Sequence, residues 1–277
     1  MSLQKEFGSK YQVSLTTHFL VVHPHGSYEK WALPFEQLFE RFKAYFRTRG
    51  LTIDEPEFPL VAVVLNSRKE FDRMLAQAKV PGARGVVGYY ALKSNRLFTY
   101  KFSHRRSEDE NIDATMDTIV HEAVHQTAFN CGIHSRIFPT PRWASEGLAT
   151  FFEAKGINNY FAFPDQKSRL NWTRLDNLRS YYEKDRVNGK LASLVANDNL
   201  FRSDPMLAYA MAWGLTSYLA ERNPHRYVQY LETLKKYEST ASSTWGNRTK
   251  QFEAAFGPIK SVEGGLQSYI QSLPKEK

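Results

Sequence analysis

The chain has 277 residues, of which 42% are hydrophobic and 14% aromatic, so it can bury a sizeable core as one large domain or as two lobes. Its formal net charge of +8 comes without a clustered basic run or a nucleic-acid-binding motif, so no nucleic acid partner is expected. A single cysteine, Cys131, excludes an internal disulfide framework and a cysteine-rich zinc finger.

The first part of the chain predicts both strands and helices. Residues 11–22 are rich in Val, Leu, Thr and Phe, and they predict a strand that ends in a turn at 23–26. A strand over 58–65 and a short helix over 68–78 are expected further along. Between these two predicted strands, residues 28–49 predict an amphipathic helix. Large apolar residues recur there at helical spacing: Trp31, Phe35, Leu38, Phe39, Phe42 and Phe46.

The middle of the chain predicts a hairpin followed by a long helix. Residues 86–91 and 96–102 are β-prone runs separated by a short polar segment, which is typical of a hairpin. A helix is expected from 114 to 130, with Asp113 as its N-terminal cap and Gly132 as its stop.

The second half of the chain predicts helices. The clearest segments are 143–153, 205–221, 224–237, 248–256 and 262–272. A sheet-bearing first half and a helical second half, without strict alternation of strands and helices, predict an α+β fold. We expect an N-terminal lobe over residues 1–132 and a helical C-terminal lobe over residues 133–277 that completes an active-site cleft.

One short motif carries recognisable metal chemistry. His121-Glu122-Ala123-Val124-His125 places two histidines four residues apart on one face of a predicted helix, where both imidazoles can reach one ion. Glu122 is rotated by one residue, so it can accept a proton from a metal-bound water as a general base. Two histidines at this spacing also fit polar residues at the edge of a core.

A second acidic element strengthens the metal interpretation. Glu146 lies near the start of an otherwise apolar helix, beside two prolines, where a buried carboxylate needs a partner. Zinc favours two imidazoles and one carboxylate with an open position for water. An exposed charge in the first turn of a helix is the other interpretation of Glu146. We expect Zn²⁺ as cofactor, held by His121, His125 and Glu146.

The spacing of these residues is similar to that of a known clan. His121-Glu-x-x-His125, then twenty intervening residues, then Glu146-Gly147-x-Ala149, resembles the gluzincin metallopeptidases, the clan of thermolysin and the zinc aminopeptidases. Over roughly residues 13–155 the chain also resembles bacterial peptidase-like domains of uncharacterised function, in the phrases Thr17-His18-Phe19, Gly88-Tyr89-Tyr90 and Trp143 to Ala149.

This resemblance implies a zincin-like fold and assigns roles to the motif residues. His121 and His125 would be zinc ligands on the active-site helix, Glu146 the third ligand and Glu122 the base that activates water. Thermolysin-like members orient a zinc-bound histidine with an Asp one turn after the ligand Glu, where this chain has Thr150. The alternative for that role is Asp117, one turn before His121.

The resemblance also implies where substrate and transition state would be held. Family members present an edge strand to which substrate backbone adds, and Gly88, Tyr89 and Tyr90 are the candidates; half-buried sheet residues are the other interpretation of the tyrosines. The oxyanion would need a donor from the C-terminal lobe, and Tyr209 is the first choice and His225 the second. The apolar neighbours of Tyr209 equally fit a core residue.

These observations predict a zinc metallopeptidase that hydrolyses a peptide or protein substrate. The Gly-Ala-Met-Glu-Asn motif of the zinc aminopeptidases is absent, which disfavours an N-terminus-recognising exopeptidase. The alternatives are a catalytically quiet zincin-like module that binds peptide or cell-envelope polymer, and a zinc amidase that acts on a non-protein substrate.

The sequence leaves compartment and oligomeric state open. No run of eighteen apolar residues occurs, so no membrane span is expected. Residues 1–3 (Met-Ser-Leu) resemble a vector remnant, so a secreted or periplasmic protein whose leader has been removed and a cytoplasmic protein are both compatible with the chain.

Overall fold

The structure is a computed structural model, and it describes residues 3–26, 28–80, 85–102, 108–136, 139–236 and 245–275. The side chains of residues 108–114, 235–236 and 245–246 are not part of that description. The chain divides into two compact units. The sheet unit comprises Met1–Ala44 and Asp54–Cys131, and the helical unit comprises Tyr45–Ile53 and Gly132–Lys277.

The sheet unit contains a five-stranded mixed sheet with the strand order β1-β2-β3-β5-β4. β1 pairs antiparallel with β2, β2 and β3 are parallel, β3 and β5 are parallel, and β4 pairs antiparallel with β5. β4 therefore forms one edge of the sheet. The strands are β1 (Tyr11–Leu15), β2 (Phe19–Pro24), β3 (Leu60–Leu65), β4 (Tyr89–Ala91) and β5 (Arg96–Tyr100).

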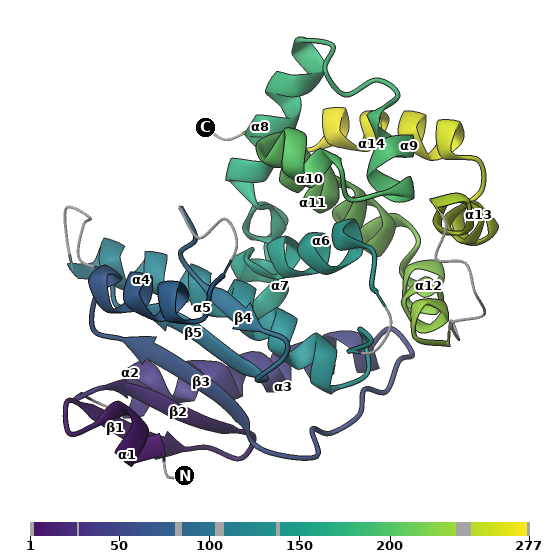
Figure 1. Ribbon diagram of the computed structural model, residues 1–277. Coiled ribbons are helices and arrows are strands. Elements are labelled where there is room, and N and C mark those ends of the chain that lie inside the picture. Colours follow the sequence, from purple (N-terminus) through teal and green to yellow (C-terminus); the bar gives the residue numbers. More distant parts are fainter. Residues whose placement is uncertain are drawn as a thin grey trace. The chain divides into compact units, whose positions relative to one another are not determined.

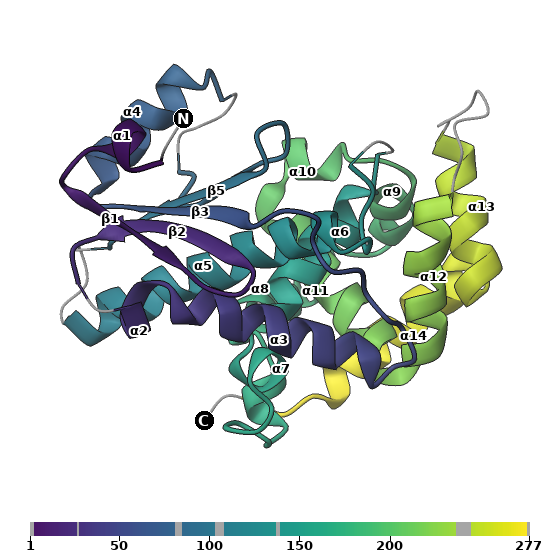
Figure 2. The same cartoon turned by 90° about the horizontal axis from the view of Figure 1, so that it is seen from below.

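Helices cover both faces of this sheet. Figure 2 shows α1 and α4 on one side of the strands and α3 and α5 on the other. On the first side, Phe71 and Leu75 are buried against the sheet, while on the second side the Phe35 and Phe39 rings lie 5.4 and 6.4 Å from that of Phe19. The helices are α1 (Leu3–Phe7), α2 (Tyr28–Trp31), α3 (Leu33–Arg47), α4 (Arg68–Gln77) and α5 (Glu108–Asn130).

Most sequence-predicted elements of this unit are confirmed, and several are corrected. The single helix expected over 28–49 is interrupted at Ala32 and forms α2 and α3. The run at residues 11–22 forms two antiparallel strands joined by a bend at 16–18, not one strand. β2 then continues through His23, where a turn was expected, and this ring is buried with its nitrogens 2.8 Å from Ser14 Oγ and 2.8 Å from the Pro24 carbonyl oxygen. Both ring nitrogens are thus paired inside the core.

The long helix α5 begins earlier than predicted. It starts at Glu108, so Asp113 lies inside the helix and is not its cap. The predicted stop is confirmed, since Gly132 follows the helix in a left-handed conformation with a φ of 70°.

The helical unit is built around α11, which is buried along most of its length and packs against α6, α8, α9, α10, α12 and α14 (Figure 1). No helix among the described residues is long and apolar enough to cross a membrane. The elements are α6 (Arg142–Phe152), α7 (Lys155–Asn158), η1 (Lys167–Arg169), α8 (Trp172–Glu183), α9 (Lys190–Ala196), α10 (Leu200–Ser203), α11 (Pro205–Arg222), α12 (Pro224–Lys236), α13 (Trp245–Phe256) and α14 (Ile259–Ser272).

Candidate metal centre

Buried polar side chains fix the rotation of α5 on the sheet. Gln126 is fully buried, and its Nε2 donates to the carbonyl oxygens of Val61 at 3.1 Å and Asn95 at 2.8 Å. One turn later, Asn130 Nδ2 donates to Asn95 Oδ1 at 2.8 Å. Because these bonds join one face of α5 to β3 and to the β4–β5 turn, the face that carries the histidine motif is fixed as well.

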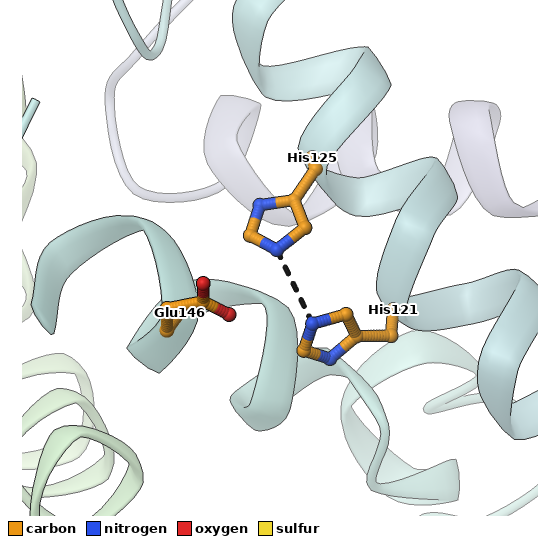
Figure 3. Close-up of side chains that lie close together, drawn as sticks. All are labelled: His121, His125 and Glu146. Carbon is orange, nitrogen blue, oxygen red and sulfur yellow. Dashed lines mark hydrogen bonds between the residues drawn. The ribbon is translucent and has the colours of Figure 1, made fainter. Parts of the chain in front are cut away.

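The two histidines of the motif point at each other. His121 and His125 are half-buried, and their Nε2 atoms lie 3.2 Å apart (Figure 3). Two nitrogens that each lie 2.0–2.1 Å from one tetrahedral zinc would be separated by about 3.3 Å. The imidazoles therefore have the spacing of two ligands of a single ion.

The general base candidate lies against the main chain of residue 88. A Cβ atom placed on Gly88 would lie only 2.5 Å from Glu122 Cγ, 2.9 Å from Glu122 Oε1 and 2.7 Å from Thr118 Cγ2. No side chain larger than hydrogen fits there unless its neighbours move. Gly88 directly precedes β4, so the edge strand of the sheet passes immediately beside this carboxylate.

The two tyrosines of β4 contact opposite faces of the sheet. Tyr89 packs against the cluster on the α4 side. Tyr90 contacts the α5 side, where its hydroxyl donates to Asn95 Oδ1 at 2.8 Å and its ring stacks on Phe129 with centroids 5.9 Å apart. Both tyrosine side chains thus have structural contacts within the sheet unit.

In the helical unit, Glu146 is part of a compact polar group. Its side chain is 13% exposed, and its Oε1 lies 3.3 Å from Nε of Arg142, one turn earlier on α6. Arg142 Nη2 lies 3.5 Å from the hydroxyl of Tyr209 on α11. Burial and the adjacent negative charge of Glu146 raise the pKa of Tyr209 well above its ordinary value.

Arg142 is not among the site residues predicted from the sequence, although its spacing to Glu146 indicates a contact. Residues four apart on a helix are neighbours, so Arg142 and Glu146 form an ion pair that the i, i+4 spacing could have indicated. By contrast, the placement of Tyr209 beside Glu146 depends on how α6 and α11 pack, which the sequence pattern does not encode.

The glycine after Glu146 allows that packing. A Cβ atom on Gly147 would lie 2.6 Å from the carbonyl oxygen of Ala212 and 2.3 Å from Thr216 Oγ1, both on α11. The two helices therefore touch at Gly147, and Tyr209 lies one turn before the contact point. In the pair Glu146-Gly147, Glu146 is a candidate metal ligand, and Gly147 is needed for the close packing of the two helices.

The remaining predicted residues take different places. His225 is exposed in the first turn of α12, and Asp117 is exposed on α5. Thr150 is buried, and its hydroxyl hydrogen-bonds to the carbonyl oxygens of Glu146 at 2.7 Å and Gly147 at 3.1 Å. The hydroxyl proton of Thr150 is thus used within its own helix.

Two groups among the described residues could hold a metal ion, and Figure 3 draws the first, His121, His125 and Glu146. The second consists of His18, Glu36 and Glu40. There the two ring nitrogens of His18 already lie 2.6 Å from Glu36 and 3.0 Å from Glu55. Both ring nitrogens of His18 thus already have carboxylate partners without a metal.

The fold and the first group together define an α+β protein with a His/His/Glu group that is compatible with a zincin-like motif. Residues 115–239 match a family described as "Protein of unknown function (DUF1570)". The matched stretch includes the histidine pair, Glu146 and Tyr209, but none of the five strands. No curated protein matches the chain. Since the family description carries no activity, function must be argued from the residues themselves.

Proposed function

We propose that this chain is a zinc-dependent metallopeptidase of the gluzincin type, with His121, His125 and Glu146 as its metal ligands. The observation that carries the proposal is the 3.2 Å separation of the two Nε2 atoms, which fits two ligands of one zinc ion. A carboxylate that is 13% exposed is a chemically suitable third ligand. This donor set leaves a fourth position for water or substrate.

Glu122 is the proposed general base. Zinc, when bound, would polarise the scissile carbonyl and lower the pKa of the attacking water. Glu122 would accept the proton of that water and pass it to the leaving amine. The close approach of Gly88 restricts the position of the Glu122 carboxylate, and the edge of β4 offers main-chain groups to an extended peptide.

Replacement of this base tests the proposal. The variant Glu122→Gln should retain one zinc per chain and lose about 10²- to 10⁴-fold in turnover, because general base catalysis typically contributes that factor. Cleavage of an unstructured protein, followed by electrophoresis with and without a chelator, measures the effect. The exposed Glu183→Gln is a matched control that should remain active. Full activity in Glu122→Gln would end the proposal.

The same assay separates the other two functions that the motif allows. Zinc binding without any cleavage would favour a catalytically quiet module that binds peptide or cell-envelope polymer. Chelator-sensitive release of an amide from a cell-wall fragment, with no proteolysis, would favour a zinc amidase. Chelator-sensitive proteolysis would support the peptidase.

A further inference from the structure

Arg142 joins the carboxylate of Glu146 to the hydroxyl of Tyr209. Arg142 Nε lies 3.3 Å from Glu146 Oε1, and Arg142 Nη2 donates to the Tyr209 hydroxyl at 3.5 Å. Burial and the nearby carboxylate charge of Glu146 raise the pKa of Tyr209. The three side chains thus form one connected polar group.

Other contacts hold Arg142 and Tyr209 in place. The Arg142 guanidinium lies over the Phe201 ring at 4.7 Å, and the Arg142 backbone N–H lies 3.3 Å from Asp198 Oδ1. The Tyr209 ring is edge-on to the same phenylalanine, with centroids 5.3 Å apart. Both side chains are therefore fixed by packing before any ligand arrives, which is what an orienting group requires.

We propose that Arg142 orients the Glu146 carboxylate as a zinc ligand and that Tyr209 holds Arg142 in place, so that both are positioning residues. This inference rests on the proposed function. Carboxylates that bind a metal are commonly hydrogen-bonded on their outer side, and loss of such partners typically weakens metal binding. Here Arg142 supplies the N–H donors to both Glu146 and Tyr209, whereas the Thr150 hydroxyl bonds only carbonyl oxygens of its own helix among the contacts described.

The inference gives Tyr209 a role different from the one the sequence suggested. A hydroxyl that accepts from Arg142, the partner of Glu146, acts through the metal ligand and does not need to touch the substrate. Replacing Tyr209 should then lower zinc affinity, whereas replacing an oxyanion donor would lower turnover. These two roles predict opposite results for one substitution.

Arg142 also has a competing interpretation, in which it is only the counter-ion of Glu146. A counter-ion would compete with zinc for the carboxylate, so its removal would leave zinc affinity unchanged or increase it. An orienting residue would have the reverse effect. Zinc affinity therefore distinguishes the two interpretations without any measurement of activity.

The experiment is a zinc titration of the metal-free full chain against a chromophoric chelator. Arg142→Gln and Tyr209→Phe should each bind zinc about 10- to 100-fold more weakly than the wild type. Arg142→Lys keeps the charge but not the planar fork of donors, so its affinity should fall between those of the wild type and Arg142→Gln. Thermal unfolding of the zinc-free proteins checks that each variant is folded.

Two matched controls use similar side chains that do not contact Glu146. Arg169 forms a comparable ion pair with Glu221, and the buried Tyr269 hydroxyl lies 2.9 Å from Ser217 Oγ. Arg169→Gln and Tyr269→Phe should bind zinc like the wild type. Equal weakening in the controls would mean a general loss of structure and would overturn the inference.

Activity at saturating zinc completes the test for Tyr209. A positioning role predicts that Tyr209→Phe recovers kcat close to the wild-type value once zinc is in excess. Unchanged zinc affinity with kcat lowered about 10²-fold or more would show an oxyanion donor and overturn the inference. A wild-type chain that binds no zinc overturns the proposed function as well, whereas zinc binding that is equal in wild type and variants overturns the inference alone.

Discussion

At the scale of single residues, the missing side chain of Gly88 leaves room for the proposed base. A Cβ atom at this position would lie 2.5 Å from Glu122 Cγ and 2.7 Å from Thr118 Cγ2. The histidine pair needs only the spacing of one helix, but the carboxylate between them depends on a strand from another part of the sequence. Gly88 is thus a constraint on the orientation of the proposed base.

A methyl group at this position should disturb the proposed base selectively. Gly88→Ala should displace the flexible Glu122 side chain, because the nearest contact is only 2.5 Å. We expect normal zinc content and turnover reduced by at least about tenfold, since general base catalysis depends on geometry. Zinc analysis and initial rates measure the two effects separately. Unchanged turnover would show that the strand does not restrict Glu122.

The sequence predicts site residues that share one helix better than contacts between residues far apart in the chain. His121, Glu122 and His125 lie on one helix, so their arrangement follows from local periodicity alone. The predicted strand makes Gly88 a substrate-binding candidate, but its proximity to Glu122 arises only when the strand packs against α5. Arg142 was recoverable from its spacing to Glu146, whereas the partnership of both with Tyr209 arises from helix packing.

At the scale of elements, the contact between α6 and α11 fixes the surroundings of Glu146. Gly147 touches the backbone of Ala212, which cannot yield as a flexible side chain can. The helices therefore approach closely at this point. Their separation determines whether Tyr209 reaches Arg142 and Glu146.

Enlarging this contact should destabilise the protein. Gly147→Ala should lower the free energy of unfolding by about 1–3 kcal/mol, the usual cost of overpacking a close contact. Gly264→Ala is the matched control, because Gly264 is also helical but has open space around its Cβ position. That control should be neutral or slightly stabilising, since alanine favours helix over glycine. Urea unfolding measures both, and equal stabilities would contradict the packing argument.

A second element-scale feature joins α3 to the bend between β1 and β2. Glu36 accepts from the His18 backbone N–H at 2.9 Å and lies 2.6 Å from His18 Nδ1. Burial alone would raise the pKa of Glu36, but the hydrogen bonds from Thr16 and His18 outweigh it and hold that pKa below its ordinary value of 4.5. The ionised carboxylate is therefore the form that stabilises the fold.

This lowered pKa gives a pH dependence with a definite sign. The stabilisation is present above about pH 4.5 and is lost as the pH falls through the lower pKa of the folded state. Glu36→Gln should be less stable at pH 7 and should lose less stability than the wild type on acidification. Thermal unfolding between pH 7 and pH 3 measures this, with Glu183→Gln as the exposed control. Parallel curves for Glu36→Gln and wild type would refute it.

Periodic elements were predictable and irregular boundaries were not. The helices α3 and α4 follow from the recurrence of large apolar residues, which are buried as expected. The hairpin of β1 and β2 escaped prediction because its bend, Thr16-Thr17-His18, contains neither glycine nor proline.

At the scale of the whole molecule, the α+β class follows from the order of the elements, because all strands in the described part of the chain lie within the first hundred residues. The two units, however, are not two continuous halves of the chain. Tyr45–Ile53 belongs to the helical unit, although it follows the sheet-unit part of α3 directly. Periodicity records which face of an element is apolar, but not which unit that face packs against.

Zinc stoichiometry shows whether His121, His125 and Glu146 hold one zinc ion, as proposed. Elemental analysis of the purified, zinc-equilibrated chain should give one zinc per wild-type chain and little or none in His125→Ala, because two remaining ligands bind zinc weakly. The exposed His225→Ala should retain one zinc as the control. Absence of zinc from the wild type, or full retention in His125→Ala, would contradict the account.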